Sequence, residues 1–232
     1  MEFSGVRAIV VDIEGTTSSI AFVKETLYPY ARQYIPDFVR DHQAGIRDIL
    51  DEVRRIEGSA ALDTPQLIAV LLRWIDEDRK LTPLKTLQGL VWRKGFDSGA
   101  LCAPVYEDAL RALRDWRERG LKLYVYSSGS VAAQRLLFAH TDQGDLTPLF
   151  SGYFDTATGS KLEAESFRTI ASSIGLPADT ILFLSDHGGE IEAARGAGMQ
   201  AVWVDRDTRP VPGGKSEGIR SFDEVTLRNP GS

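Results

Sequence analysis

The chain has 232 residues, 43% of them hydrophobic, which is enough for one large globular domain or for a domain with an insertion. Its 27 Lys and Arg against 33 Asp and Glu give a net charge of −6, which argues against nucleic acid as a partner. Cys102 is the sole cysteine, so an intrachain disulfide is excluded and a reducing, cytoplasmic location is expected. No leader pattern opens the chain and no apolar run reaches the roughly twenty residues of a membrane span, so we expect no membrane partner.

Three apolar runs each end in polar residues that favour turns. Residues 8–11 lead into Asp12-Ile13-Glu14-Gly15-Thr16-Thr17, residues 121–126 into Ser127-Ser128-Gly129-Ser130, and residues 181–184 into Ser185-Asp186-His187-Gly188-Gly189-Glu190. Such runs are typical of buried parallel strands, whose carboxyl ends border the ligand crevice in an open α/β sheet. The sequence therefore predicts a polar site at one edge of a sheet, with Asp12 and Asp186 among its members.

Lys161 lies between the second and third of these strands, just before a helical pattern that runs from Phe167 to Ile174 and ends at Gly175. A cation at the start of a helix is disfavoured by the helix dipole. This placement favours a role for the charge of Lys161 over simple solvation at the surface.

The order of predicted elements indicates an α/β fold with a helical insertion. Helical stripes occur at residues 46–56, 67–75 and 84–91, and Thr64-Pro65 and Thr82-Pro83 predict helix starts with a capping hydroxyl. Alternating helices and strands resume after Ala103, the last strands being predicted at 201–204 and 219–225. We expect a doubly wound parallel sheet, with a core domain of residues 1–17 and 104–232 and a helical cap domain of residues 18–103.

An aspartate after one strand, hydroxyls after a second, a lysine, and an aspartate after a third resemble the haloacid dehalogenase-like superfamily, whose members mostly transfer phosphoryl groups through an aspartyl-phosphate. A closer resemblance, spanning about residues 9–205, is to the enolase-phosphatase family of methionine salvage. Glu14 is the most specific match, because most phosphatases of the superfamily carry aspartate at this position. The strings that carry the resemblance are Asp12-Ile13-Glu14-Gly15-Thr16-Thr17, Ile20-Ala21-Phe22-Val23-Lys24, Leu87-Gln88-Gly89 with Trp92-Arg93, Tyr126-Ser127-Ser128-Gly129-Ser130 and Gly152-Tyr153-Phe154-Asp155-Thr156.

The resemblance implies the same Rossmann-like core and cap, and it assigns roles to the polar residues. Asp12 is the candidate nucleophile and Glu14 the candidate general acid and base. Lys161 is expected to balance the charge of the aspartyl-phosphate and to bind the substrate. Ser127 and Ser128 are expected to bind phosphate oxygens at a helix start, with Ser130 as the helix cap.

A divalent cation is also expected, because Asp12, Glu14, Asp186 and the substrate phosphate together carry far more negative charge than Lys161 can balance. Oxygen ligands select Mg²⁺, one ion per chain, held by Asp12, Asp186 and Glu14. Whether Glu14 binds through its carboxylate or its backbone carbonyl stays open. Glu190 is expected to order the surroundings of Asp186, and His187 receives no role.

The resemblance implies a phosphorylated diketone, 2,3-diketo-5-methylthiopentyl-1-phosphate, as the small-molecule substrate. Enolisation and dephosphorylation would give the acireductone 1,2-dihydroxy-3-keto-5-methylthiopentene. Phe22, Trp92 and Phe96 are candidates for contacts to the methylthio end, although packing within the cap is the favoured interpretation of these aromatic residues. We expect a monomer, since no heptad or repeat seam stands out.

Three alternatives compete with this interpretation. A phosphatase of the same superfamily could act on another small phosphate monoester, since rim residues do not fix the substrate. A receiver-type signalling module also phosphorylates an aspartate at a strand end, but it would need about half this length and no helical insertion. A catalytically inactive binding protein is disfavoured because Asp12, Lys161 and Asp186 are all present.

Overall fold

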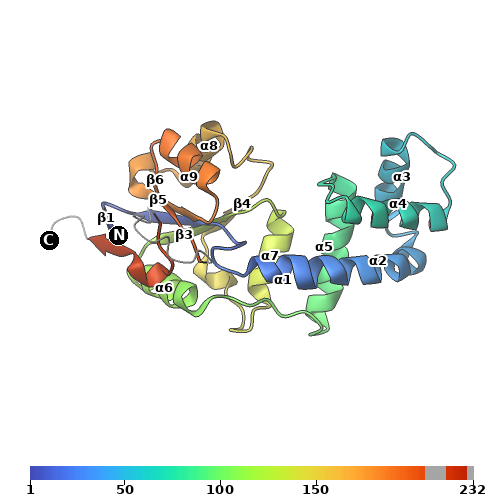
Figure 1. The fold of residues 1–232 in the computed structure, drawn as a ribbon, viewed down its shortest axis with the longest axis horizontal. Helices are drawn as coiled ribbons and strands as arrows, with labels where there is room; N and C mark the ends of the chain where they lie inside the picture. Colours follow the sequence, from blue (N-terminus) through green and yellow to red (C-terminus); the bar gives the residue numbers. More distant parts are fainter. Residues whose placement is uncertain (207–217, 229–232) are drawn as a thin grey trace, which may run out of the picture. The chain divides into compact units, whose positions relative to one another are not determined.

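A five-stranded parallel sheet forms the centre of the computed structural model, which describes residues 1–206 and 218–228 (Figure 1). The strand order is β4-β3-β2-β5-β6, so the chain winds outward from β2 in one direction, then returns to β5 and winds outward in the other. The point where the order reverses, between β2 and β5, is where doubly wound sheets bind ligands. The strands are β2 (Ala8–Val11), β3 (Lys122–Tyr126), β4 (Gly152–Phe154), β5 (Ile181–Ser185) and β6 (Gln200–Trp203).

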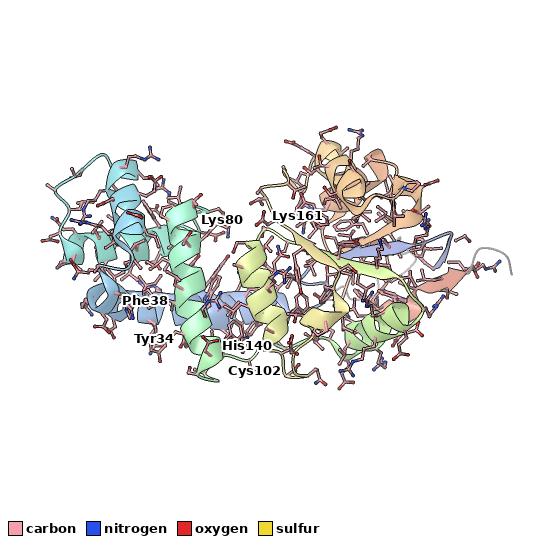
Figure 2. All side chains as sticks on the ribbon, turned by 180° about the vertical axis from the view of Figure 1, so that it is seen from behind. Tyr34, Phe38, Lys80, Cys102, His140 and Lys161 are labelled. Atoms are coloured by element: carbon pink, nitrogen blue, oxygen red, sulfur yellow. The ribbon has the colours of Figure 1, made fainter. Side chains whose placement is uncertain are left out.

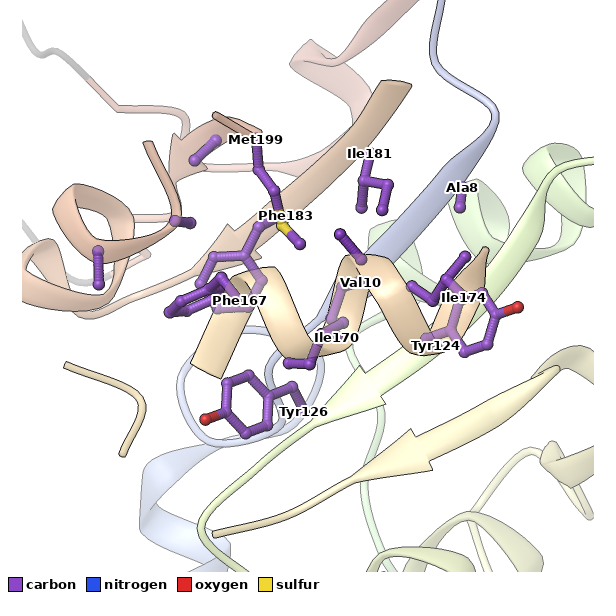
Figure 3. Close-up of a cluster of buried hydrophobic side chains, with 14 of the residues drawn as sticks. Ala8, Val10, Tyr124, Tyr126, Phe167, Ile170, Ile174, Ile181, Phe183 and Met199 are labelled. Atoms are coloured by element: carbon purple, nitrogen blue, oxygen red, sulfur yellow. The ribbon is translucent and has the colours of Figure 1, made fainter. Parts of the chain in front are cut away.

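Helices cover both faces of this sheet, as the alternating pattern predicted. In Figure 1, α8 and α9 lie above the sheet and α6 lies below it. Phe167 and Ile170 of α8 pack on Val10 and Phe183 of the central strands, all fully buried (Figure 3). The helices are α6 (Glu107–Glu118), α7 (Val131–Ala139), α8 (Ala164–Ile174) and α9 (Gly188–Gly196), with short 3₁₀ turns η2 (Thr147–Leu149) and η3 (Ala178–Thr180).

The strand predicted over residues 219–225 is wrong. Ile219 forms a single bridge with Val204, and the chain then turns into the 3₁₀ helix η4 (Phe222–Glu224). Ser221 starts this turn by accepting the N–H of Asp223, a local bond that competes with an extended strand. The strand follows instead as β7 (Thr226–Arg228), which pairs in parallel with β1 (Glu2–Ser4) in a separate two-stranded sheet.

Contacts between Cα atoms divide the chain into two compact units, one of Met1–Ile20 with Ala103–Ser232 and one of Ala21–Cys102. The chain leaves the first unit shortly after β2 and returns before α6. Two hydrogen bonds join these segments, from Ser18 Oγ to the Pro104 carbonyl at 2.7 Å and from the Tyr106 N–H to the Thr17 carbonyl at 3.0 Å. The insertion therefore begins and ends at neighbouring points.

The second unit is helical and has a core of its own. Its buried side chains include Trp74, Leu67 and Leu87, all fully inaccessible to solvent. Phe22 and Phe96 are buried as well, and the Trp92 indole donates to the Leu27 carbonyl at 2.8 Å, in agreement with the packing role predicted for these aromatics. The helices are α1 (Ile20–Phe22), the π-helical η1 (Val23–Leu27), α2 (Tyr28–His42), α3 (Arg47–Ile56), α4 (Thr64–Asp76) and α5 (Thr82–Asp97).

Two local features of this unit differ from the sequence analysis. Helix α2 was not among the predicted elements. It contains Pro36, a residue that disfavours helix interiors, yet the helix forms and buries Ile35 and Val39. Helix α4 is capped by Asp63 rather than by Thr64: the Asp63 carboxylate accepts the Gln66 N–H at 2.9 Å.

Thr82 is likewise not a cap, since it is the first residue of α5 and Leu81 occupies the N-cap position. In both cases the proline occupies the second helical position instead of the first. None of the helices over residues 1–206 and 218–228 combines the length and apolar character that crossing a membrane requires.

The capping box of α4 gives a test of this assignment. Asp63→Ala should lower the free energy of unfolding by about 1 kcal/mol, because it leaves N–H groups of the first turn without their partner. Thr82→Ala removes the hydroxyl that the sequence predicted as the cap of α5. This change should lower the free energy of unfolding by only a few tenths of that amount. Urea denaturation followed by circular dichroism measures both, and equal losses for the two variants would contradict the assignment.

Candidate active site

Asp12 lies at the carboxyl end of the central strand. Its N–H continues the β2–β5 ladder by donating to the Leu184 carbonyl at 2.9 Å, and the residue as a whole is buried. Val11 pairs with Val125 of β3 on one side and with Leu184 of β5 on the other. The residues that end these neighbouring strands therefore flank Asp12, which brings Ser127 and Asp186 to the same edge of the sheet.

Lys161 reaches this edge from the loop before α8 and makes two buried ion pairs (Figure 2). Its Nζ lies 2.5 Å from Asp12 Oδ1 and 2.7 Å from Glu190 Oε2, and the three side chains are 9%, 8% and 12% exposed. Burial alone would lower the pKa of Lys161, but the two carboxylates raise it above its usual range. Lys161 is therefore a charged member of the cluster that contains the candidate nucleophile.

Glu190 lies between Lys161 and the residues on either side of Asp186. Its carboxylate binds Lys161 and accepts the Ser185 hydroxyl at 2.7 Å, and that hydroxyl oxygen accepts the His187 N–H at 3.1 Å. Burial, with the nearby Asp12 charge, raises the pKa of Glu190. Glu190 thus orders Lys161 and the turn after β5 that contains Asp186, as expected, and its charge also raises the pKa of Asp186.

Asp186 is held by its backbone on both sides. Its N–H donates to Thr16 Oγ1 at 3.0 Å, and its carbonyl accepts the Trp203 indole N–H at 2.7 Å. Burial and the charges of Asp12 and Glu190 raise the pKa of the Asp186 carboxyl to about 6. Acidic groups are therefore crowded at this point more closely than one lysine can balance.

Gly15 is required twice in the loop that follows Asp12. Its φ of +70° lies in the left-handed region, which side chains with a Cβ rarely adopt. A Cβ added here would also lie 2.7 Å from Cγ of Asp186. The absence of a side chain thus lets the Asp186 carboxylate approach the backbone of the nucleophile loop.

The loop around Glu14 is fixed by its own backbone. The Gly15 N–H donates to the Ser18 carbonyl at 2.8 Å, the Ile13 carbonyl accepts N–H groups of the residues that follow, and Thr17 Oγ1 donates to the Asp12 carbonyl at 3.0 Å. Glu14 is partly buried at the outer turn of this loop. This hydrogen-bonded turn places Glu14 two residues beyond Asp12, the candidate nucleophile.

The donors at this edge are oxygens of Asp12 and Asp186, which suit Mg²⁺. Burial and the charge of Asp12 both raise the pKa of Asp186, so a cation between the two carboxylates would be favourable. Within residues 1–206 and 218–228, no three side chains of His, Cys, Asp or Glu are grouped as a metal site.

The hydroxyl loop lies between β3 and α7. Ser127 is 4% exposed and its Oγ accepts the Gly129 N–H at 3.2 Å, whereas Ser128 is exposed. Ser130 Oγ accepts the Ala133 N–H at 3.3 Å, which confirms its predicted role as the cap of α7. The hydroxyls and the helix N-terminus at this end of β3 are features that bind phosphate oxygens.

Sequence analysis missed two residues that support the hydroxyl loop. Gln134 Nε2 donates to the Gly129 carbonyl at 2.7 Å and to the Phe154 carbonyl at 2.8 Å, and the side chain is 2% exposed. Asp155 Oδ2 accepts the Val131 N–H at 3.0 Å. The signal for Gln134 was a polar side chain on the apolar, buried side of α7. Asp155 follows β4, an edge strand too short to predict.

Gly15→Ala tests the close approach of Asp186. The variant should reduce Mg²⁺-dependent turnover of a phosphate ester by at least about 100-fold, because the new methyl displaces a candidate metal ligand. Gly175→Ala is the matched control, since Gly175 has a φ of +73° with nothing within 4 Å of the added Cβ. Both should lose stability of about 1 kcal/mol, but only the first should lose activity; equal activity losses would contradict the argument.

The Asp186 carboxyl gives a dependence of stability on pH in the presence of a chelator. Its pKa is raised from 3.8 to about 6, so its contribution is complete below about pH 4 and is lost as the pH rises through 6. Asp186→Asn should therefore gain about 1 kcal/mol of stability over the wild type between acid and neutral pH, after allowance for solvent screening. Urea denaturation at several pH values checks this, and a difference that falls with pH would contradict it.

Known proteins with similar sequences and folds identify the family of this chain. The family description "haloacid dehalogenase-like hydrolase" matches residues 6–198. The enolase-phosphatase E1 of Parvibaculum lavamentivorans is 54% identical over 88% of this chain and 87% of its own, and that of Pseudomonas aeruginosa is 51% identical over 96% and 99%. The solved UTR4 protein of Saccharomyces cerevisiae, 35% identical, superposes with a TM-score of 0.81 over 94% of this chain and 99% of its own. The chain belongs to the haloacid dehalogenase-like hydrolases and, within them, to the enolase-phosphatase E1 family.

Proposed function

We propose that the protein is an acireductone synthase of methionine salvage, which converts 2,3-diketo-5-methylthiopentyl-1-phosphate to 1,2-dihydroxy-3-keto-5-methylthiopentene and phosphate. The observation that carries the proposal is the buried Asp12–Lys161 pair at the end of β2, at the point where the strand order of the sheet reverses. The enolase-phosphatase relatives, about half identical over nearly the whole chain, supply the substrate.

In the phosphatase step, a carboxylate oxygen of Asp12 attacks phosphorus. A bond forms between that oxygen and phosphorus while the bond from phosphorus to the ester oxygen breaks, which gives an aspartyl-phosphate. Glu14 donates a proton to the leaving oxygen and then accepts one from water, which attacks the aspartyl-phosphate and releases phosphate. The ammonium of Lys161 stays beside the reacting oxygens and balances the charge that gathers there.

The phosphate group itself is held at the neighbouring strand end. Ser127 and Ser128 offer hydroxyls, and the backbone N–H groups at the start of α7 face the same edge of the sheet. One Mg²⁺ per chain would be held by Asp12, Asp186 and residue 14, where it would neutralise phosphate charge and polarise the diketone. The ion pair with Lys161 holds the Asp12 carboxylate in place before the phosphate ester binds.

The helical unit Ala21–Cys102 is proposed to act as the cap domain, with core residues 1–17 and 104–232 as the catalytic domain. The chain is proposed to work as a monomer in the cytoplasm, a location that its lone cysteine permits. A phospho-aspartate signalling module is not favoured, because a separately packed helical unit has no part in such a mechanism.

Turnover of the diketo phosphate with and without Mg²⁺ tests the function. We expect Mg²⁺-dependent phosphate release together with a transient enol absorbance, and release from a panel of simple phosphate monoesters at least about 100-fold slower. Asp12→Asn should abolish both phosphate release and burst labelling of the protein, because an amide cannot form the aspartyl-phosphate.

The outcomes separate the alternatives. Release from all esters at similar rates would leave the phosphatase chemistry and remove the enolase activity. A long-lived phosphorylated protein without turnover would indicate the signalling module instead. Full activity in Asp12→Asn would refute the mechanism. Asp115→Asn, which changes an exposed aspartate of α6 paired with Arg119, serves as the control and should keep burst labelling.

A further inference from the structure

The side chain of Arg206 donates hydrogen bonds to the loop that follows Asp12. Its Nε and Nη2 both donate to the Thr16 carbonyl, at 2.9 and 2.7 Å, and its Nη1 donates to Asp108 Oδ2 at 3.0 Å. The Arg206 and Asp108 side chains are only 10% and 14% exposed. The guanidinium also lies over the Tyr106 ring, 4.0 Å from its centroid. Arg206 is thus a buried, fully engaged cation that binds the loop at Thr16, four residues beyond Asp12.

Asp108 is itself anchored from a third segment. Besides Arg206, its Oδ2 accepts the Ser221 hydroxyl at 3.0 Å and the Phe222 N–H at 2.7 Å. Burial alone would raise the pKa of Asp108, but the Phe222 N–H and the Arg206 charge bring it below its usual range. The carboxylate therefore stays charged. It joins three segments: its own helix α6, the turn η4, and Arg206 in the segment that follows β6.

Thr16 connects this point to Asp186. Its carbonyl accepts Arg206, and its hydroxyl oxygen accepts the Asp186 N–H. Thr16 is fully buried, so neither bond has water as a substitute. A shift of Thr16 would therefore move the backbone of Asp186 relative to Asp12.

We propose that Arg206 is a positioning residue which, through Thr16, sets the placement of Asp186 beside Asp12 and thereby the affinity of the site for Mg²⁺. The proposal rests on the proposed function, in that it takes Asp12 and Asp186 as the metal ligands. Arginine is needed because its planar fork gives two N–H groups to one carbonyl and a third to a carboxylate, which a lysine ammonium cannot do in that geometry.

A functional reason also explains why an ion pair is kept here. A buried pair of this kind gives little net stability compared with apolar residues of the same volume. Its hydrogen bonds instead fix the direction of the Thr16 carbonyl. Removing such a bond behind a metal ligand typically weakens metal binding by about 10- to 100-fold.

Titration calorimetry with Mg²⁺ alone tests the proposal without relying on turnover. Arg206→Lys should raise the Kd for Mg²⁺ by about tenfold. Because Arg206→Met would leave Asp108 buried without its partner, it is paired with Asp108→Asn, and this double variant should show at least the same rise. Thr16→Val removes the other half of the link, and its effect should not add to that of the double variant.

Arg119→Met is the matched control. The Arg119 guanidinium also donates to a backbone carbonyl, that of Leu227 at 2.9 Å, and pairs with Asp115, but it contacts neither loop of the site. This variant should lower the melting temperature and leave the Kd for Mg²⁺ unchanged. All titrations are made well below the melting temperature of each variant, so that loss of folded protein does not enter the Kd.

Two results would overturn the proposal, and they differ. If the wild type binds Mg²⁺ and the folded Arg206 variants bind it equally well, Arg206 has no positioning role and the proposed function stands. If the wild type itself binds no Mg²⁺, the proposed metal ligands are wrong and the inference falls with them.

Discussion

The ammonium of Lys161 is the interaction on which the site depends. Asp12 and Glu190 are both nearly buried, and a carboxylate removed from water without a partner would take up a proton and lose its nucleophilic character. With Lys161 between them, both carboxylates share one cation in a place from which water is largely excluded. The same ammonium needs no movement if phosphate charge arrives, since it already lies beside Oδ1 of Asp12, the proposed nucleophile.

Topology explains how residues distant in sequence reach this ammonium. Each crossover of the sheet starts at a carboxyl end of a strand, so Asp12, Ser127 and Asp186 all leave the sheet at the same edge. The loops that follow are held by backbone groups more than by side-chain packing, as the bonds of the Ile13 carbonyl and of Ser18 show. Precision at the site therefore comes from short, self-bonded turns on fully buried strands.

Sequence patterns predicted the parts of this protein that depend on local chemistry. The buried strands, the polar turns after them and the Ser130 cap follow from neighbouring residues. Helix α2 contains Pro36, which locally disfavours a helix, and only the folded protein shows that the apolar face of α2 is buried. Arg206 and Gln134 escaped because their partners, the carbonyls of Thr16 and Phe154, are backbone groups brought near only by the fold. A side chain whose partner is a distant backbone carbonyl leaves no pattern in the sequence.

The paired ends of the insertion have a consequence for how such enzymes diversify. Ser18 and Thr17 bond directly to the segment that returns at Pro104 and Tyr106, so the core closes on itself whatever lies between. An inserted unit of different length or fold would meet the same two anchor points and would leave the catalytic turn undisturbed. Evolution could therefore exchange the inserted helical unit while the turn after β2 stays unchanged.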